Sequence, residues 1–211
     1  MIKNIFLIHH THTDIGYTDI QTSVFNDHIR FLDNVLEYCD RTDGYPEYAK
    51  FRWTCEVIWQ VEHYFRYRPE RIKEFIKRVK QNRIEITGLY LNLTDLFSLE
   101  MLVRSLYPCM ELKKRYGIDV TTGMNCDING LSWAIPQLLN SIGIKYLLMA
   151  TNEIRGFAPS VKRPFWWTVP DNKSKLLVWN AGRKLWYAEG IRLGFTDSYR
   201  KVKDLLPDYL V

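Results

Sequence analysis

The sequence predicts an α/β fold in which parallel strands alternate with helices. Short apolar runs alternate with segments whose apolar residues recur every three or four positions, which is the pattern of a parallel β/α layout. The 211 residues are 46% hydrophobic and 25% charged, enough apolar material for the core of a globular domain. No internal repeat, low-complexity segment or Pro/Gly/Ser-rich linker divides the sequence. We therefore expect one β/α domain covering residues 1–211.

The apolar runs place five strands. They are expected at residues 5–8, 51–54, 83–87, 120–125 and 144–149, and two further candidates lie at 165–168 and 175–179. Between the first five expected strands, the segments have apolar residues at helical spacing or residues that typically begin or end a helix. Gly117 and Gly143 are placed to end two of these helices. A closed eight-stranded β/α barrel takes about 250 residues. The chain is therefore expected to hold only part of a larger catalytic domain.

The charged residues, the apolar runs and the cysteines indicate which partners and which cellular compartment to expect for this protein. The formal net charge is +5, but the basic residues are spread along helix-like segments, which favours solvated helix faces over a nucleic-acid surface. No apolar run reaches the length of a membrane span, and the N-terminal run is too short for a secretory signal. The four cysteines lack CxxC pairing, which is typical of reduced thiols in a cytoplasmic protein. The oligomeric state stays open.

The strongest local signal directly follows the first expected strand. Residues i and i+2 of an extended segment point the same way, so His12 and Asp14 can converge on one ion. An imidazole nitrogen with a carboxylate oxygen suits Zn²⁺, and the carboxyl ends of parallel strands carry the site in such folds. The alternative is a polar loop in which both side chains form local hydrogen bonds.

Asp127 follows the fourth expected strand. On its own it would cap the helix expected from Leu131, but with His12 and Asp14 it would give three ligands at one rim of the sheet. Glu56, after the second strand, is either an acceptor behind such a site or a charge at a helix N-terminus. Asp95, after the third strand, is a further candidate for the cleft.

Several segments carry a family resemblance. Residues 10–17 are His-Thr-His-Thr-Asp-Ile-Gly-Tyr, residues 51–56 end the second strand, residues 83–88 are Arg-Ile-Glu-Ile-Thr-Gly, and residues 126–130 precede a Pro-Gln-Leu-Leu and a Gly-Ile pair. In order and spacing, over residues 5–179, this set resembles the N-terminal catalytic domain of glycoside hydrolase family 38 α-mannosidases. The family's motifs at the first and last of these places are His-Ser-His-Asn-Asp-Pro-Gly-Trp and Asp-x-Phe-Gly.

The resemblance implies a seven-stranded (β/α) barrel of the glycoside hydrolase/deacetylase type, incomplete in this chain. It also implies retaining hydrolysis of α-mannosides, with Zn²⁺ as cofactor and a carbohydrate as partner. His12, Asp14 and Asp127 would bind the zinc, and Asp127 would also be the catalytic nucleophile. The residues expected to contact substrate are Tyr17, which replaces the motif's tryptophan, together with Asp95, Arg155 and Tyr187.

The sequence also departs from the family pattern. The phenylalanine of Asp-x-Phe-Gly is Asn129, and Ala150-Thr151-Asn152 stands where the family has an arginine, for which Arg155 is a candidate substitute. The family's acid/base carboxylate and its fourth zinc ligand, a histidine, are expected beyond Val211. Three carboxylates remain available, although none lies in a recognisable motif: Asp171, Glu189 and Asp197.

Two other functions remain open from the sequence. A metal-dependent amidohydrolase or carbohydrate deacetylase also places a His/Asp cluster after an early strand, with a metal-activated water as nucleophile. A non-catalytic remnant that binds sugar would account for the departures at Asn129 and Thr151 and for the missing second carboxylate.

Overall fold

The structure is a computed structural model, and it describes residues 4–94, 96–128, 130–152, 154, 163–170, 173–181 and 186–209. The strands are β1 (Trp53–Cys55), β2 (Ile84–Ile86), β3 (Thr122–Cys126), β4 (Tyr146–Ala150), β5 (Phe165–Thr168) and β6 (Lys175–Asn180). The α-helices are α1 (Gln21–Arg41), α2 (Ile58–Tyr67), α3 (Ile72–Lys80), α4 (Leu99–Ser105), α5 (Tyr107–Tyr116), α6 (Ala134–Ser141), α7 (Glu189–Arg192) and α8 (Tyr199–Tyr209). Short 3-10 helices are η1 (Glu47–Ala49), η2 (Pro69–Arg71) and η4 (Trp186–Ala188).

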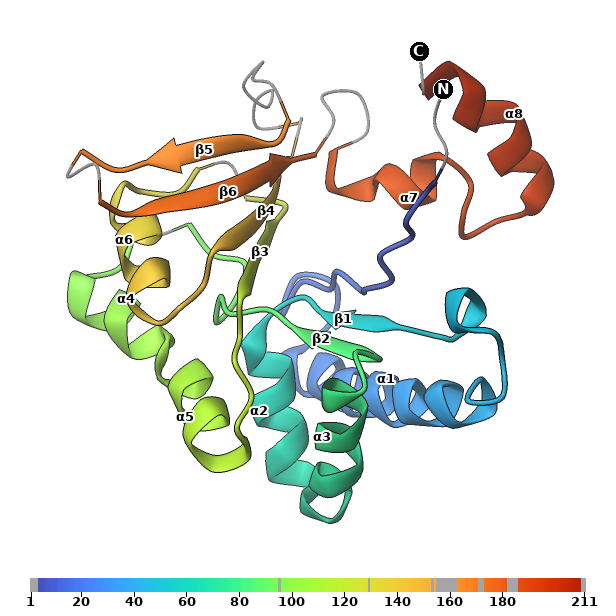
Figure 1. Ribbon diagram of the computed structural model, residues 1–211, viewed down its shortest axis with the longest axis horizontal. Helices are drawn as coiled ribbons and strands as arrows, with labels where there is room; N and C mark the ends of the chain where they lie inside the picture. The colour runs from blue at the N-terminus through green and yellow to red at the C-terminus, as the bar shows by residue number, and fades with distance from the viewer. Residues whose placement is uncertain are drawn as a thin grey trace.

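The strands form two sheets that meet at one point. β1 and β2 pair in parallel, and the larger sheet has the order β3-β4-β6-β5. A single bridge joins Thr87 to Thr122, and the N–H of Gly88 donates to the carbonyl of Thr122 at 2.9 Å. The end of β2 therefore lies beside the start of β3 (Figure 1). Each neighbouring pair along the order β1, β2, β3, β4 and β6 is parallel.

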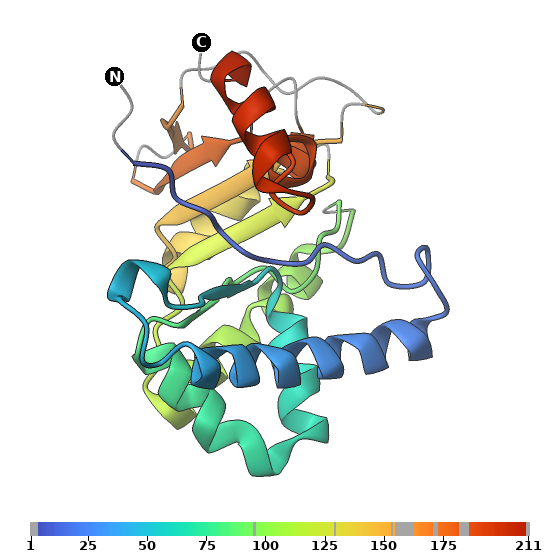
Figure 2. The same ribbon diagram turned by 90° about the vertical axis from the view of Figure 1, so that its right-hand side faces the viewer.

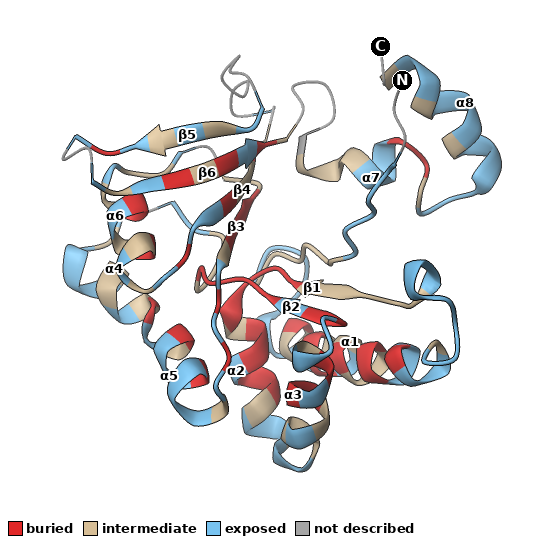
Figure 3. Ribbon diagram, viewed as in Figure 1, coloured by how far each residue is buried: buried red, intermediate tan, exposed pale blue. Residues whose placement is uncertain are grey.

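Helices cover the sheets because their apolar residues recur on one face. In α1 the buried side chains follow a three- and four-residue spacing from Val24 to Cys39, as an amphipathic helix requires. Figures 1 and 2 place α1, α2 and α3 together on one side of the β1–β2 pair. The buried residues gather between these helices and the strands (Figure 3), with Leu36, Tyr64 and Phe75 among the most deeply buried.

The expected seven-stranded barrel is wrong. The described strands form two separate open sheets, and β5 pairs antiparallel with β6. The connection from Thr168 to Lys175 is of hairpin length, which joins antiparallel neighbours, whereas a parallel crossover needs a dozen or more residues. β5 thus takes the sheet edge at which a closed parallel barrel would continue.

The first expected strand also differs. Residues 5–8 form no regular strand and their side chains are largely exposed. The segment still lies beside β1, because the N–H of Thr54 donates to the carbonyl of His9 at 2.8 Å. The other expected strands correspond to β1 to β6 within two residues at each end.

Two further observations bear on the chemistry of the chain. All four cysteines are buried and free of disulfides. Among the described residues, no helix has the length and apolar character needed to cross a membrane.

Candidate metal centre

The polar side chains that follow successive strands meet at one rim of the sheets. His12 and Asp14 come after the N-terminal extended segment, Glu56 directly follows β1, and Asp127 directly follows β3. Because these segments run side by side in one direction, their carboxyl ends lie together. The site is thus built by strand order, from residues more than one hundred positions apart.

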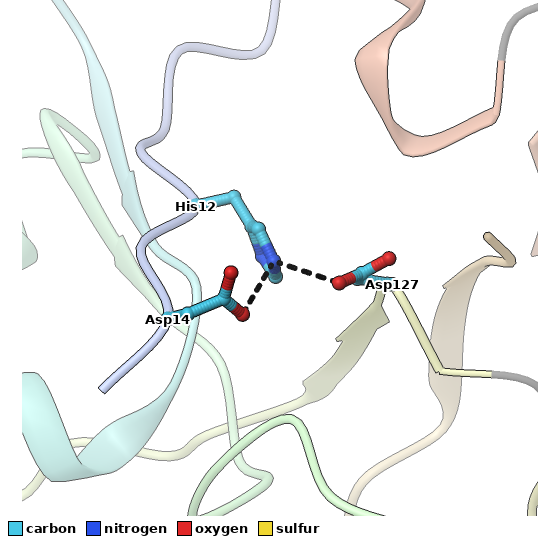
Figure 4. A group of neighbouring side chains, drawn as sticks. All are labelled: His12, Asp14 and Asp127. Carbon is cyan, nitrogen blue, oxygen red and sulfur yellow. Dashed lines mark ion pairs between the residues drawn. The ribbon is translucent and has the colours of Figure 1, made fainter. Parts of the chain in front are cut away.

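His12 lies between the two aspartates. Its Nε2 is 3.8 Å from Asp14 Oδ1 and 3.7 Å from Asp127 Oδ2 (Figure 4). One ligand atom from each residue lies within 4.8 Å of the others. Ligand atoms about 2.0–2.2 Å from a tetrahedral Zn²⁺ lie about 3.3–3.6 Å apart. The group therefore needs only small side-chain movements to share one cation.

Glu56 fixes the orientation of the His12 ring. His12 Nδ1 donates to Glu56 Oε1 at 2.8 Å, and the Glu56 side chain is 2% exposed. This hydrogen bond places the ring proton on Nδ1 and leaves Nε2 as the acceptor that faces the aspartates. Nε2 is buried without a hydrogen-bond partner. A buried polar atom of this kind costs free energy unless something binds it, and a cation would do so.

The electrostatics of the group also favour a cation. Burial lowers the pKa of His12, but the Glu56 hydrogen bond and the charges of Glu56, Asp14 and Asp127 together raise it above its ordinary value. One imidazole thus faces three carboxylates, which carry a formal charge of −3. A divalent ion would offset most of that charge, and its donor set of one nitrogen and two oxygens suits zinc.

Asp127 is held by backbone and side-chain contacts. Its N–H donates to the carbonyl of Ala150 at 2.7 Å, and its Oδ1 accepts from Asn152 Nδ2 at 2.6 Å. The capping role is not observed, because α6 begins at Ala134 without a side-chain cap. Likewise, Glu56 is committed to His12, whereas α2 begins only at Ile58.

The other residues expected at the site have varied positions. The ring of Tyr187 lies 4.9 Å from the ring of His12, centroid to centroid, at an angle of 50°. Tyr17 is 90% exposed. Asp95 and Arg155 lie outside the described residues, as do Asn129 and Asp171. The roles of Tyr17, Asp95, Arg155 and Tyr187 in substrate binding stay predictions.

The remaining carboxylate candidates have partners elsewhere. Glu189 accepts from the hydroxyl of Tyr209 at 2.9 Å, and Asp197 pairs with Lys201 at 2.9 Å. Neither of these contacts involves Asp127.

Sequence reasoning missed two asparagines that support the site. Asn92 accepts from the N–H of Cys126 at 3.0 Å, and its Nδ2 lies 3.4 Å from His12 Nδ1. Asn152 holds Asp127 as described above. Both follow a strand of the same rim, and this position was the signal that could have identified them.

A separate apolar cavity of about 830 Å³ lies among α2, α4, α5 and α6. Its walls include Val61, Leu102, Leu131 and Leu139. Charged side chains also line it, among them Glu62, Arg66 and Glu111. Among the described residues, the group that could hold a metal ion lies at the rim around His12 and not in this cavity, so the rim is the candidate site for metal-dependent chemistry.

Residues 3–189 match the sequence model of the family described as "Glycosyl hydrolases family 38 N-terminal domain". The match covers most of the chain, and the chain belongs to this family. No curated protein sequence matches the chain.

Solved structures show the same fold. An alpha-mannosidase from Enterococcus faecalis V583 is 22% identical with a TM-score of 0.67, over 87% of this chain and 20% of that one. A family 38 glycosyl hydrolase from Enterococcus faecalis is 18% identical with a TM-score of 0.60, over 93% and 21%. A 4-alpha-glucanotransferase from Thermococcus litoralis is 16% identical with a TM-score of 0.59, over 95% and 30%. The chain spans about a fifth of the length of the first two.

Proposed function

We propose that this chain carries the metal site and the nucleophile of a retaining glycoside hydrolase that acts on α-mannosides. Family membership supports glycosidase chemistry. The observation that carries the metal proposal is the buried, unpartnered His12 Nε2 between two carboxylates. The similar structure named an alpha-mannosidase supports the choice of sugar.

His12, Asp14 and Asp127 would hold the zinc. When bound, zinc would act as a Lewis acid that orients the hydroxyl groups of the sugar at the site. Glu56 keeps the His12 ring in the tautomer that leaves Nε2 able to bind. Tyr187, beside the His12 ring, would offer an aromatic face or a hydroxyl to the sugar.

Asp127 would attack the anomeric carbon. A carboxylate oxygen forms the new C–O bond while the glycosidic C–O bond breaks, and the departing alcohol takes a proton from a general acid. Water then hydrolyses the resulting ester and restores Asp127. Two inversions at the same carbon give net retention.

Covalent labelling tests this assignment. Treatment of the protein with a fluorinated mannosyl fluoride, which forms a slowly hydrolysed adduct, should add one fluoromannosyl group to Asp127 by peptide mass spectrometry. D127N should take up no label, whereas D119N, a matched change at an exposed aspartate paired with Lys113, should label like the wild type.

The alternatives predict other results. Metal-dependent cleavage of an amide or ester without an adduct would indicate the deacetylase class. Sugar binding that a chelator does not change would indicate a non-catalytic sugar-binding protein.

A further inference from the structure

The backbone at Asp127 is in an unusual conformation. Its φ is +64°, in the left-handed region that few residues other than glycine adopt. The pairing of Cys126 with Ala150, followed by the hydrogen bond from Asp127 N to Ala150 O, imposes this turn at the end of β3. Strain of this kind persists where the surrounding structure over-determines it, which is common at functional sites.

Asn152 is oriented by its own loop. The N–H of Ile154 donates to Asn152 Oδ1 at 2.9 Å. Because the amide oxygen takes that contact, the amide nitrogen must face the other way, toward Asp127 Oδ1 at 2.6 Å. Asn152 therefore presents a donor, and not an acceptor, to the carboxylate.

The two oxygens of Asp127 thereby have separate environments. Oδ1 accepts from Asn152, while Oδ2 faces His12 Nε2 at 3.7 Å. A neutral amide fixes the carboxylate without pairing its charge.

We propose that Asn152 is a positioning residue that holds Asp127 Oδ1, so that Asp127 presents Oδ2 to the metal. The inference rests on the proposed metal site and adds the assignment of each oxygen. Asn152 acts through Asp127 and contacts neither the metal nor the sugar in this role.

The test measures metal binding in variants that lose the amide donor. N152L keeps the approximate volume of the side chain, and N152A removes the same donor with a smaller group. N140L is the matched control, because Asn140 also makes two hydrogen bonds at 2.7 and 2.9 Å, to Lys175 N and Ile144 O, but lies away from the rim. Zinc affinity is measured by competition with a chromophoric chelator, and Co²⁺ absorption reports the geometry of the bound ion.

Both Asn152 variants should bind zinc about 10- to 100-fold more weakly, as is usual when a residue that orients a metal ligand is removed. Their Co²⁺ spectra should differ from that of the wild type, while N140L should keep the wild-type affinity and spectrum even if it is less stable. If folded N152L or N152A keeps the wild-type zinc affinity and Co²⁺ spectrum, the inference about Asn152 is wrong, while the proposed metal site is unaffected. Failure of the wild type to bind zinc would overturn the metal proposal and this inference with it.

Discussion

Two clusters of charged side chains lie at opposite ends of β1 and β2, and they differ in charge balance. At the amino ends, buried Arg78 and Arg83 meet Asp40 and Asp43. At the carboxyl ends, one histidine meets Glu56, Asp14 and Asp127. The first cluster has two positive and two negative groups, whereas the second has three carboxylates around one imidazole and therefore an excess of negative charge.

The balanced cluster serves the fold. Arg83 donates to Asp43, to Thr42 Oγ1 and to the carbonyls of Phe51 and Cys39, with distances from 2.6 to 3.0 Å. It thereby ties the end of α1 to the start of β2. In the unbalanced cluster, hydrogen bonds hold His12 and Asp127 in place, but negative charge is left uncompensated, which is what a cation site requires. The Arg78–Arg83 cluster therefore stabilises the fold, whereas the cluster around His12 is suited to bind a cation.

Removal of Arg83 should give the largest change in stability. R83L leaves two buried backbone carbonyls without their donor and removes one of the two arginines that pair with Asp43, so the free energy of unfolding should fall by about 2–5 kcal/mol. Urea denaturation measures the change, and zinc affinity should stay at the wild-type value.

R115L is the control for this change, because Arg115 forms an exposed ion pair with Glu111 and should cost at most about 1 kcal/mol. Equal stability of R83L and R115L would remove the basis of the comparison.

A change in the unbalanced cluster should affect binding instead. D14N should weaken zinc binding by roughly 100-fold or more, since loss of a direct ligand costs at least as much as loss of a residue behind it. The metal-free protein should be no less stable, because the change relieves repulsion among carboxylates. Chelator competition measures the zinc affinity and urea denaturation measures the stability of the metal-free protein, with D119N as the control. A D14N protein with unchanged affinity would contradict the ligand assignment.

A third change tests the junction between the two sheets, which brings Glu56 and Asp127 to one rim. A Cβ at Gly88 would clash with Ile144 Cδ1 and lie 3.2 Å from Val120 Cγ1. G88A should therefore lower the free energy of unfolding by about 1–3 kcal/mol. G44A should have little effect, because a Cβ there meets nothing within 4 Å. Thermal or urea unfolding distinguishes them, and equal stabilities would argue against close packing at Gly88.

The smallest expected effect is the acid sensitivity of the balanced cluster. Hydrogen bonds from Arg78 and Arg83 outweigh partial desolvation and lower the pKa of Asp43 to about 2, from an ordinary value of about 3.8. Since the folded-state pKa is the lower one, this contribution to stability is present above about pH 4 and is lost as the pH falls through about 2. Unfolding measured from pH 6 to pH 2 should show a shallower acid loss in D43N than in the wild type. Identical profiles would contradict the pairing.

Local pattern predicted much of this architecture. The apolar runs gave the approximate positions of β1 to β6, and Gly117, at φ +66°, ends α5 as expected. The barrel could not be predicted correctly, because closure depends on how the edges pair. The exposed N-terminal segment and the antiparallel β5 decided against it.

The candidate site followed from the position of polar residues after strands. That rule placed His12, Asp14 and Asp127 on one rim, and the structure brings them together, while their roles as ligands and nucleophile stay predictions. The contacts of Glu56 with His12 and of Asn152 with Asp127 depend on how side chains from distant segments point toward one another. One sequence contains no local signal for such directions.

Anomalous diffraction at the zinc edge, from crystals of the protein grown with Zn²⁺, would show whether His12, Asp14 and Asp127 bind the cation. If these residues bind zinc, we expect one strong peak within about 2.3 Å of His12 Nε2 and of a carboxylate oxygen from each of Asp14 and Asp127. Data from the same crystal below the edge should show a much weaker peak. A strong peak elsewhere, or none among these three side chains, would contradict this assignment.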